Sequence, residues 1–368
     1  MLKLLNFIKS EIVLSIAIIL TIITCFFVPI DKEYLAYFDY NTLITLFCML
    51  AVVAGLKKTN IFEILSRKMI SLFHKRRSVI YALIFGTFFF DMIVANNMSL
   101  ITFLPLTYLV LHTTGNDKYL AFTFIMQTIA ANMGGMITPY GNPQNLFLYS
   151  YYNMSVVEFF TTLLPYTFAV ACLLFICCLF VKNEPLELKK KEKIIIDKKR
   201  LPIYSCLFVL VILSIFRIIP YILTFVVCII LICIVDIKVL KKVDYALLAT
   251  FCVFFIFSGN MSRIDVIKEF ISQIVVNNTL IAGIVSCQFI SNVPSAIFLS
   301  KFTNDYNNLL VAVNIGSLGI IISSLASLIT LKEFLKHQRK KFKEYILLFT
   351  CFNTLFLFFM LLLSKYIN

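Results

Sequence analysis

Long apolar runs recur along the whole chain and limit the folds open to it. Runs such as 12–30, 41–57 and 346–364 are each long enough to cross the roughly 30 Å hydrocarbon core of a bilayer as one α-helix. Most of them have no polar face, and 61% of the 368 residues are hydrophobic. A soluble domain of this length would carry polar faces on its helices. The sequence therefore predicts an all-α polytopic membrane protein.

Two further apolar stretches do not read as simple crossings. The predicted single or broken spans are 118–150, 156–181, 201–219, 221–238, 244–259 and 307–330. In contrast, 78–112 and 278–303 are interrupted near their middles by "VANNMS" and "FISNVPS", and we interpret each as a re-entrant hairpin. The segments 59–75 and 261–275 carry charges at helical spacing beside apolar residues, which is typical of helices lying in the membrane interface.

The basic residues favour the hairpin interpretation. The net charge is +14, but Lys and Arg cluster between apolar runs, at 57–77, 182–200 and 332–343, as in cytoplasmic loops rather than a nucleic-acid-binding surface. With two hairpins and Lys3 and Lys9 inside, most basic residues face the cytoplasm. If 78–112 alone became a full crossing, the basic 182–200 segment would move outside. We therefore expect a bacterial-type plasma membrane protein with a cytoplasmic N-terminus.

Three pairs of segments indicate an internal repeat. "FDYNTLITLFC" (38–48) resembles "VDYALLATFC" (243–252), "ANNMSLITFLP" (95–105) resembles "ISNVPSAIFLS" (290–300), and "AANMGG" (130–135) resembles "AVNIGS" (312–317). In the topology above, the matching helices run in opposite directions, so the repeats are inverted. Inverted repeats with paired helix breaks are typical of secondary transporters, whose site lies near the bilayer midplane.

This pattern divides the chain into four parts. They are an N-terminal transmembrane helix (1–34), a first repeat (35–181) with hairpin 78–112 and broken helix 118–150, a basic cytoplasmic linker (182–200), and a last part (201–368) with two connecting helices and a second repeat, which contains hairpin 278–303 and broken helix 307–330.

The stretch "ANMGGMITPYGNPQNL" (131–146) shows what the breaks offer chemically. Non-helical backbone survives at membrane depth only where protein buries it or where it lines a cavity. The free N–H end of a half-helix attracts anions, and its free carbonyl end attracts cations. The predicted substrate- or ion-binding residues are Asn96, Asn97, Ser99, Asn132, Gly134, Thr138, Gly141, Asn142, Asn145, Ser291, Asn292, Ser295, Asn314, Gly316 and Ser317. Close helix packing remains an equal interpretation for Ser323, Ser324 and Ser327.

Asp91 is the one carboxylate deep inside an apolar run. Intramembrane acids are costly and mark ion pathways, so we expect Asp91 to carry a coupling proton or to face a cation. The alternative is a structural, hydrogen-bonded aspartate. On a continuous helix, Asp91 would lie about 9 Å short of the tip at Asn97. No Lys or Arg lies in any break, so an anion would be held by hydroxyls, amides, helix N-termini and a co-bound cation.

Other function classes lack their motifs. The 11 Cys lie mostly within apolar runs without a Cys-x-x-Cys pair, and the three His lie at basic segments or helix ends. We therefore expect no cofactor and no metal beyond a Na⁺. Paired carboxylates, a Ser–His pair and a P-loop are not visible either, which argues against an enzyme. An ion channel would need a continuous pore lining rather than two converging breaks.

At these motifs the chain resembles the ion transporter superfamily. "NMGGMITPYGNPQNLFLY" (132–149) is similar to the Thr-Pro-x-Gly-Asn-Pro-Gln-Asn stretch of arsenite permeases and D-type sodium/proton antiporters, and "QFISNVPSAIFL" (288–299) is similar to their Ser-Asn-Val-Pro hairpin tip. "NNMSLITFLPL" (96–106) matches the first hairpin, where relatives often read Thr-Asn-Asp. Asn96 and Asn97 stand here instead of Thr and Asp, and Asp91 could supply the missing carboxylate.

The resemblance implies two hairpins and two broken helices around a central site, and it allows a homodimer. Citrate transporters and divalent anion/sodium symporters belong to the same group. We therefore expect a secondary active transporter that moves a small anion, carboxylate-like or an inorganic oxyanion, by alternating access coupled to Na⁺ or H⁺. The alternative is a cation/proton antiporter or an arsenite-type efflux permease. The expected partners are the ion substrate and the lipid bilayer, not nucleic acid.

Overall fold

The computed structural model describes residues 12–94, 96–186 and 194–367, and over these ranges the chain forms helices and no strands. Six helical segments are long and apolar enough to cross a membrane, or seven if a bent pair counts as one span. These findings confirm an all-α polytopic membrane protein. The predicted cytoplasmic position of Lys3 and Lys9, and the middle of the predicted linker at 187–193, lie outside the described residues.

The helices of the first half follow the predicted spans, with a break inside each interrupted stretch. They are α2 (Ile12–Cys25), α3 (Tyr40–Lys58), α4 (Ile61–Ser71), α5 (Arg76–Asp91), α6 (Asn96–Thr113), α7 (Leu120–Gly134), α8 (Pro143–Tyr151) and α9 (Val156–Leu179). Those of the second half are α10 (Arg200–Ile215), α11 (Tyr221–Asp236), α12 (Tyr245–Arg263), α13 (Asp265–Asn277), α14 (Thr279–Ile290), α15 (Asn292–Leu299), α16 (Tyr306–Ile315), α17 (Leu325–Gln338) and α18 (Phe342–Ile367).

The Asp-Tyr pair that begins each repeat has a local physical role. Asp39 accepts a hydrogen bond from the Thr42 amide (3.1 Å) and so caps α3, and Asp244 accepts one from the Leu247 amide (3.0 Å) and caps α12. An aspartate at this position satisfies an amide that has no partner within the helix and also favours the positive end of the helix dipole. The sequence similarity therefore marks equivalent helix starts in the two halves.

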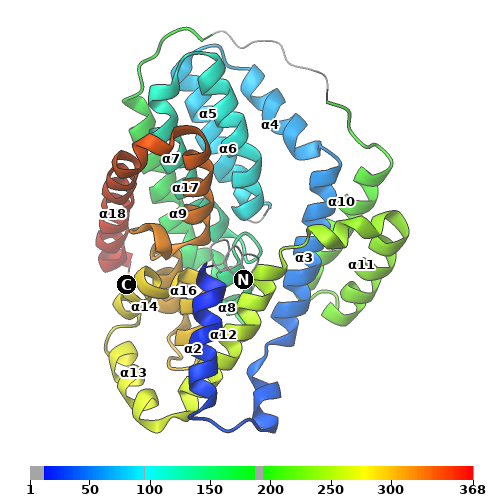
Figure 1. Cartoon of the computed structure of the whole chain (residues 1–368), viewed down its shortest axis with the longest axis vertical. Helices are drawn as coiled ribbons and strands as arrows, with labels where there is room; N and C mark the ends of the chain where they lie inside the picture. Colours follow the sequence, from blue (N-terminus) through cyan, green and yellow to red (C-terminus); the bar gives the residue numbers. More distant parts are fainter. Residues whose placement is uncertain (1–11, 95, 187–193, 368) are drawn as a thin grey trace.

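The two halves repeat one order of elements in opposite directions. A long helix, a short amphipathic helix, a helical hairpin, a broken helix and a last long helix follow each other from α3 to α9 and again from α12 to α18. Figure 1 shows α3 running up toward α4, whereas α12 runs down toward α13. Within the hairpins, α5 packs against α6 and α14 against α15. The amphipathic α13 bends 118° away from α14.

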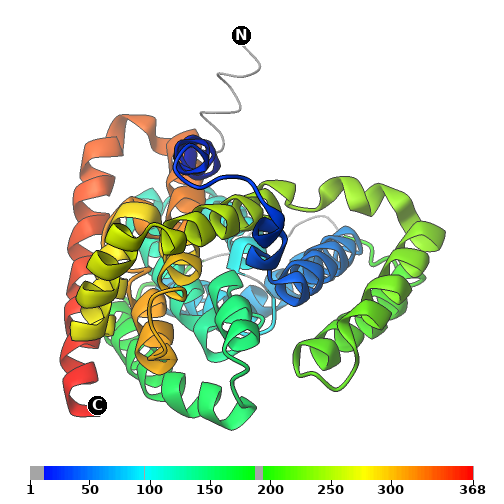
Figure 2. The same ribbon diagram turned by 90° about the horizontal axis from the view of Figure 1, so that it is seen from below.

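The broken helices lie at the centre of the molecule. Helix α7 packs against α5, α6, α9 and α17, and α8 packs against α15 and α3. Helices α10 and α11 pack on α3 at one edge, and α18 stands at the opposite edge (Figure 2). The residues of α7 from Thr123 to Gly134 are all buried, so polar groups there must find partners inside the protein.

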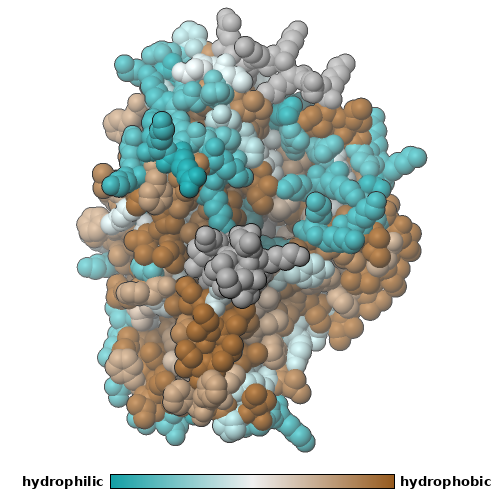
Figure 3. All heavy atoms as spheres, in the orientation of Figure 1, coloured by the Kyte–Doolittle hydropathy of each residue, from teal (hydrophilic) through white to brown (hydrophobic). Residues whose placement is uncertain are grey.

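The face shown in Figure 3 is more polar in one half than in the other. Polar side chains gather over the upper half of the view in Figure 3, and apolar ones over most of the lower half. Ion pairs join the basic segments to each other and to the end of α11: Arg76 with Glu184 at 2.5 Å, and Asp236 with Lys58 and Arg200. The Arg76 guanidinium holds the pKa of Glu184 below its ordinary value. The basic segments 57–77 and 182–200 therefore lie together on one side of the fold.

Candidate functional site

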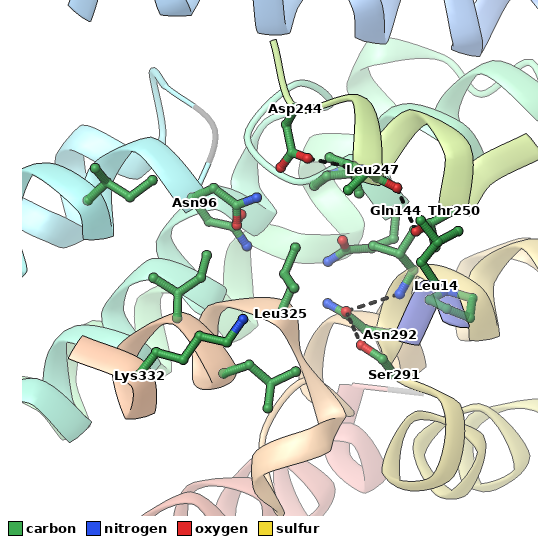
Figure 4. A pocket seen from close by; sticks show the side chains of 18 residues that line it. Leu14, Asn96, Gln144, Asp244, Leu247, Thr250, Ser291, Asn292, Leu325 and Lys332 are labelled. Carbon is green, nitrogen blue, oxygen red and sulfur yellow. Dashed lines mark hydrogen bonds between the residues drawn. The ribbon is translucent and has the colours of Figure 1, made fainter. Parts of the chain in front are cut away.

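A cavity of about 200 Å³ lies where the two hairpin tips meet. From the predicted set, Asn96 and Asn97 line it at the first tip, and Ser291 and Asn292 line it at the second. Gln144, from the first turn of α8, lies between them (Figure 4). The structure thus brings Asn97 and Asn292, which lie about 195 positions apart in the chain, to one hollow.

The two tips turn in different ways. In the first, α5 ends at Asp91 and α6 begins at Asn96, whose amide donates to the Gly141 carbonyl (3.3 Å). In the second, the chain reverses at Ser291 alone, which takes a φ of 76°. Positive φ is uncommon for a residue other than glycine, and such strained backbone clusters at functional sites. The second tip is therefore held in a costly conformation at the cavity.

The first break, between α7 and α8, is held open by asparagine side chains. The Asn142 amide donates to the carbonyl of Asn132 (3.0 Å), and the Asn145 amide donates to that of Met136 (3.0 Å). Thr138 donates to the carbonyl of Met92 in the hairpin (3.0 Å). The two asparagine bonds satisfy carbonyls that the broken helix leaves without a partner, and the Thr138 bond ties the break to the hairpin. Their geometry makes the break a fixed part of the fold.

Three hydrogen bonds join the two breaks across the centre. Asn132 donates to the Ser324 hydroxyl (2.9 Å), Asn314 donates to the side-chain oxygen of Asn145 (2.7 Å), and Gln144 donates to that of Asn314 (3.3 Å). All five side chains are buried. The predicted residues Asn132, Asn145 and Asn314 therefore join the two repeats and do not line the cavity, whereas Gln144 does.

The second break, between α16 and α17, is stabilised by hydroxyls and one glutamine. Ser323 donates to the Ser317 carbonyl (2.7 Å), and Ser317 donates to that of Asn314 (2.6 Å). Gln288 of α14 donates to the carbonyls of Gly316 (2.8 Å) and Leu318 (3.0 Å) and accepts from the Ile320 amide (3.0 Å). Gln288 was not among the residues predicted from sequence.

Several predicted residues serve packing in this structure. A Cβ on Gly134 would collide with the Phe88 carbonyl, and one on Gly141 would collide with the Gly135 carbonyl. A Cβ on Gly316 would lie 2.9 Å from the Cys287 sulfur. Ser295 is buried and bonds Ser286 (2.8 Å). These four positions serve packing or hydrogen bonding within the protein, and none of them lines the cavity.

Asp91 is fully buried and belongs to the first tip. Its Oδ1 accepts a hydrogen bond from the Ser99 hydroxyl (2.6 Å). The continuous helix expected between Asp91 and Asn97 is not found, because α5 ends at Asp91 and the chain turns before α6 begins at Asn96. A Cβ on Gly135 would collide with Asp91 Oδ2 and lie 2.8 Å from Asn142 Oδ1. Neither oxygen has a hydrogen-bond donor among the described residues.

The cavity also contains charged residues that the sequence reasoning did not assign to it. Lys332 was placed with the basic segment 332–343, but α17 continues to Gln338, so Lys332 lies on a helix that lines the cavity. Asp244, the cap of α12, lines the opposite wall with Thr250 (Figure 4). The apolar spacing of Leu325, Leu328 and Ile329, followed by Lys332, is the signal that could have placed this face.

Comparisons with known proteins agree with this architecture. A family model described as a citrate transporter matches residues 4–330. An uncharacterized transporter of Methanocaldococcus jannaschii is 33% identical over 304 residues, which cover 80% of this chain and 81% of the relative. The inner membrane protein YbiR of Escherichia coli is 26% identical over 313 residues, which cover 83% of each chain. The chain therefore belongs to the citrate transporter family of the ion transporter superfamily, and it is a multi-pass membrane transporter.

Proposed function

We propose that the chain is a secondary active transporter that moves a small anion by alternating access, coupled to Na⁺ or H⁺. The observation that carries this proposal is the cavity enclosed by one hairpin tip from each inverted repeat. A site shared by two inverted halves can open to either side when one half moves against the other. The citrate transporter description of the matching family supports a carboxylate as the cargo.

Helix starts around the cavity favour an anion. Helix α6 begins at Asn96, α8 at Pro143 and α15 at Asn292, and all three residues line the cavity. The N-terminal end of a helix carries a partial positive charge and amides without partners. The positive ends of three helix dipoles, together with the side-chain amide of Asn97, favour a carboxylate or an oxyanion in the cavity.

We place the coupling ion behind the first tip, beside Gly135. Asp91 Oδ2 and Asn142 Oδ1 approach the same point there and lack donors. Buried acceptors without donors cost about 1–3 kcal/mol each, or more when charged. A Na⁺ between the two oxygens, or a proton on Asp91, would remove that cost. Ion binding here would also fix the tip that forms half of the cavity.

The buried carboxylate of Asp91 also supports one alternative function, the transport of a cation or of arsenite. An arsenite-type efflux permease or a cation/proton antiporter would use Asp91 as its cation site and carry no organic anion. The helix starts described above would then have no ligand to bind, which is why we favour the anion.

A flux panel in proteoliposomes separates these functions. Purified protein would be tested for uptake of citrate, sulfate and arsenite, and for Na⁺ flux, under imposed Na⁺ or pH gradients. We expect gradient-driven accumulation of citrate or sulfate, abolished when the coupling gradient is collapsed with an ionophore. Arsenite or Na⁺ movement without movement of either anion would overturn the proposal in favour of the alternative.

The membrane orientation is a separate proposal with its own test. The shared side of the basic segments supports a cytoplasmic location for the 182–200 linker and the N-terminus, and an outside location for 301–306. Single cysteines at Asn183 and Asn304, which are both exposed, can be introduced into a Cys-less background. In intact cells we expect an impermeant thiol reagent to label Asn304→Cys only. Labelling of Asn183→Cys from outside would contradict the two-hairpin topology.

A further inference from the structure

The wall of the cavity formed by α17 carries a lysine. Leu325, Leu328, Ile329 and Lys332 line the cavity from this helix, so they form one face along its first two turns. Lys332 lies about 10 Å beyond Leu325 along the helix axis. Helical side chains lean toward the helix N-terminus, and Figure 4 shows the Lys332 ammonium directed back toward Leu325, on the side of Asn292.

Charges of opposite sign face each other across this cavity. Among the described residues that line it, Lys332 is the one Lys or Arg, and Asp244 is the one acid. Asp244 Oδ1 accepts from the Leu247 amide, so this carboxylate is already engaged at the positive end of α12. The lining between the two charges is largely apolar, with Leu14, Leu247 and Leu325. Charges act more strongly on a ligand where apolar walls reduce the screening by water.

We propose that Lys332 is the specificity-determining residue that selects an anion for its negative charge. Its ammonium holds one acidic group of the substrate on the α17 wall, while the amides and helix starts of the hairpin tips hold another. The fitting cargo is a small anion with two or more acidic groups, in preference to a monoanion of equal size. This inference rests on the proposed anion transport.

The test uses charge variants on both walls and a matched lysine. Lys332→Gln removes the charge, and Lys332→Arg keeps it. Lys336→Gln is the control, because Lys336 lies one turn later on α17, pairs with Glu333 at 2.5 Å and does not line the cavity. Asp244→Asn removes the opposing charge but preserves the cap, since asparagine caps helices as well as aspartate.

Initial rates of [¹⁴C]citrate and [³⁵S]sulfate uptake would be measured in proteoliposomes, with succinate and butyrate as competitors. We expect Lys332→Gln to raise KM about tenfold with a smaller change in kcat, and to reduce the preference for succinate over butyrate. Lys332→Arg should restore KM to within about threefold of wild type. Lys336→Gln should match wild type, and Asp244→Asn should leave KM equal or lower.

Two results would overturn the inference while leaving the proposed function intact. One is a Lys332→Gln protein with wild-type KM and wild-type preference for succinate. The other is an Asp244→Asn protein whose KM rises as much as that of Lys332→Gln, because opposite charges must have opposite effects. Wild-type protein that takes up neither citrate nor sulfate would instead overturn the proposed function, and this inference with it. Size-exclusion profiles in detergent would verify that each variant is folded.

Discussion

The two hairpins occupy equivalent places in the repeats, but they differ in charge at the same position. The alignment that pairs Asn97 with Asn292 places Asp91 opposite Ser286. Asp91 bonds Ser99 across the first hairpin (2.6 Å), and Ser286 bonds Ser295 across the second (2.8 Å). A hydroxyl bond of this kind crosses both hairpins, although Ser295 lies one position beyond the residue that aligns with Ser99. Only the first half places a carboxylate in this bond.

The helix breaks next to the two hairpins differ in the same way. Gly135 faces Asp91, where a Cβ would collide, whereas its counterpart Ser317 keeps a side chain that bonds the Asn314 carbonyl (2.6 Å). The first break leaves Asp91 Oδ2 and Asn142 Oδ1 without donors. The second is closed by the three bonds of Gln288. The comparison shows that the first half has buried oxygens without donors that an added ion could bind. In the second half, the side chain of Gln288 already bonds the backbone of the break.

The largest effect should come from removing the one charge that distinguishes the hairpins. We expect Asp91→Asn to reduce gradient-driven anion accumulation at least about tenfold, since a full charge at this depth dominates ion binding. Substrate exchange without a gradient should persist. The matched variant Ser286→Ala should accumulate anion nearly as wild type does. The measurement is anion accumulation, and its pH dependence, in proteoliposomes. If Asp91→Asn leaves both unchanged, Asp91 has a structural role only.

Adding a side chain where the first break has none should have the next largest effect. Gly135→Ala forces a Cβ against Asp91 Oδ2, and such overpacking costs about 1–3 kcal/mol. We expect a lower midpoint in thermal unfolding and a loss of any stabilisation by Na⁺. Ser317→Ala loses one hydrogen bond, about 1 kcal/mol, and should keep the response of wild type to Na⁺. Equal unfolding midpoints and equal Na⁺ responses for the two variants would contradict the proposed difference between the first and second breaks.

Gln288→Leu tests whether the second break depends on its glutamine. The change removes three hydrogen bonds to the backbone of the second break, and we expect a loss of about 1–3 kcal/mol, seen as a lower unfolding midpoint in detergent. Coupling per transported anion should stay unchanged, because no ion is placed here. Gln273→Leu, at an exposed position on α13, is the control. A wild-type midpoint for Gln288→Leu would argue against a closed second break.

The smallest effect should come from removing one asparagine side chain at either hairpin tip, and it should be equal at the two tips. Asn97→Ala and Asn292→Ala each remove one side-chain amide from the cavity, and one neutral hydrogen bond corresponds to about a threefold to fivefold rise in KM. Expression and thermal stability should match wild type. Near-normal flux from both variants would show that the cavity amides do not contact the substrate.

Much of the fold follows from local sequence, and parts of the site do not. The tips at Asn97 and Asn292 were predicted because polar residues interrupt apolar runs there, and both residues line the cavity. Asn132 and Asn314 were predicted for the same reason, but the structure uses them to join the two breaks. A pattern shows that a polar residue at membrane depth needs a partner, but it does not say whether that partner is a ligand or another side chain.

The sequence by itself determined the helical spans, the places of the breaks and the repeat, because hydrophobic length, prolines and helix caps act within a few residues. Only the tertiary structure decided that Asp91 meets Ser99, that Gly135 must lack a side chain, and that Lys332 lies on the cavity wall. These contacts join separate elements, and some cross between the two halves. Their geometry depends on how whole helices pack, which no local pattern specifies.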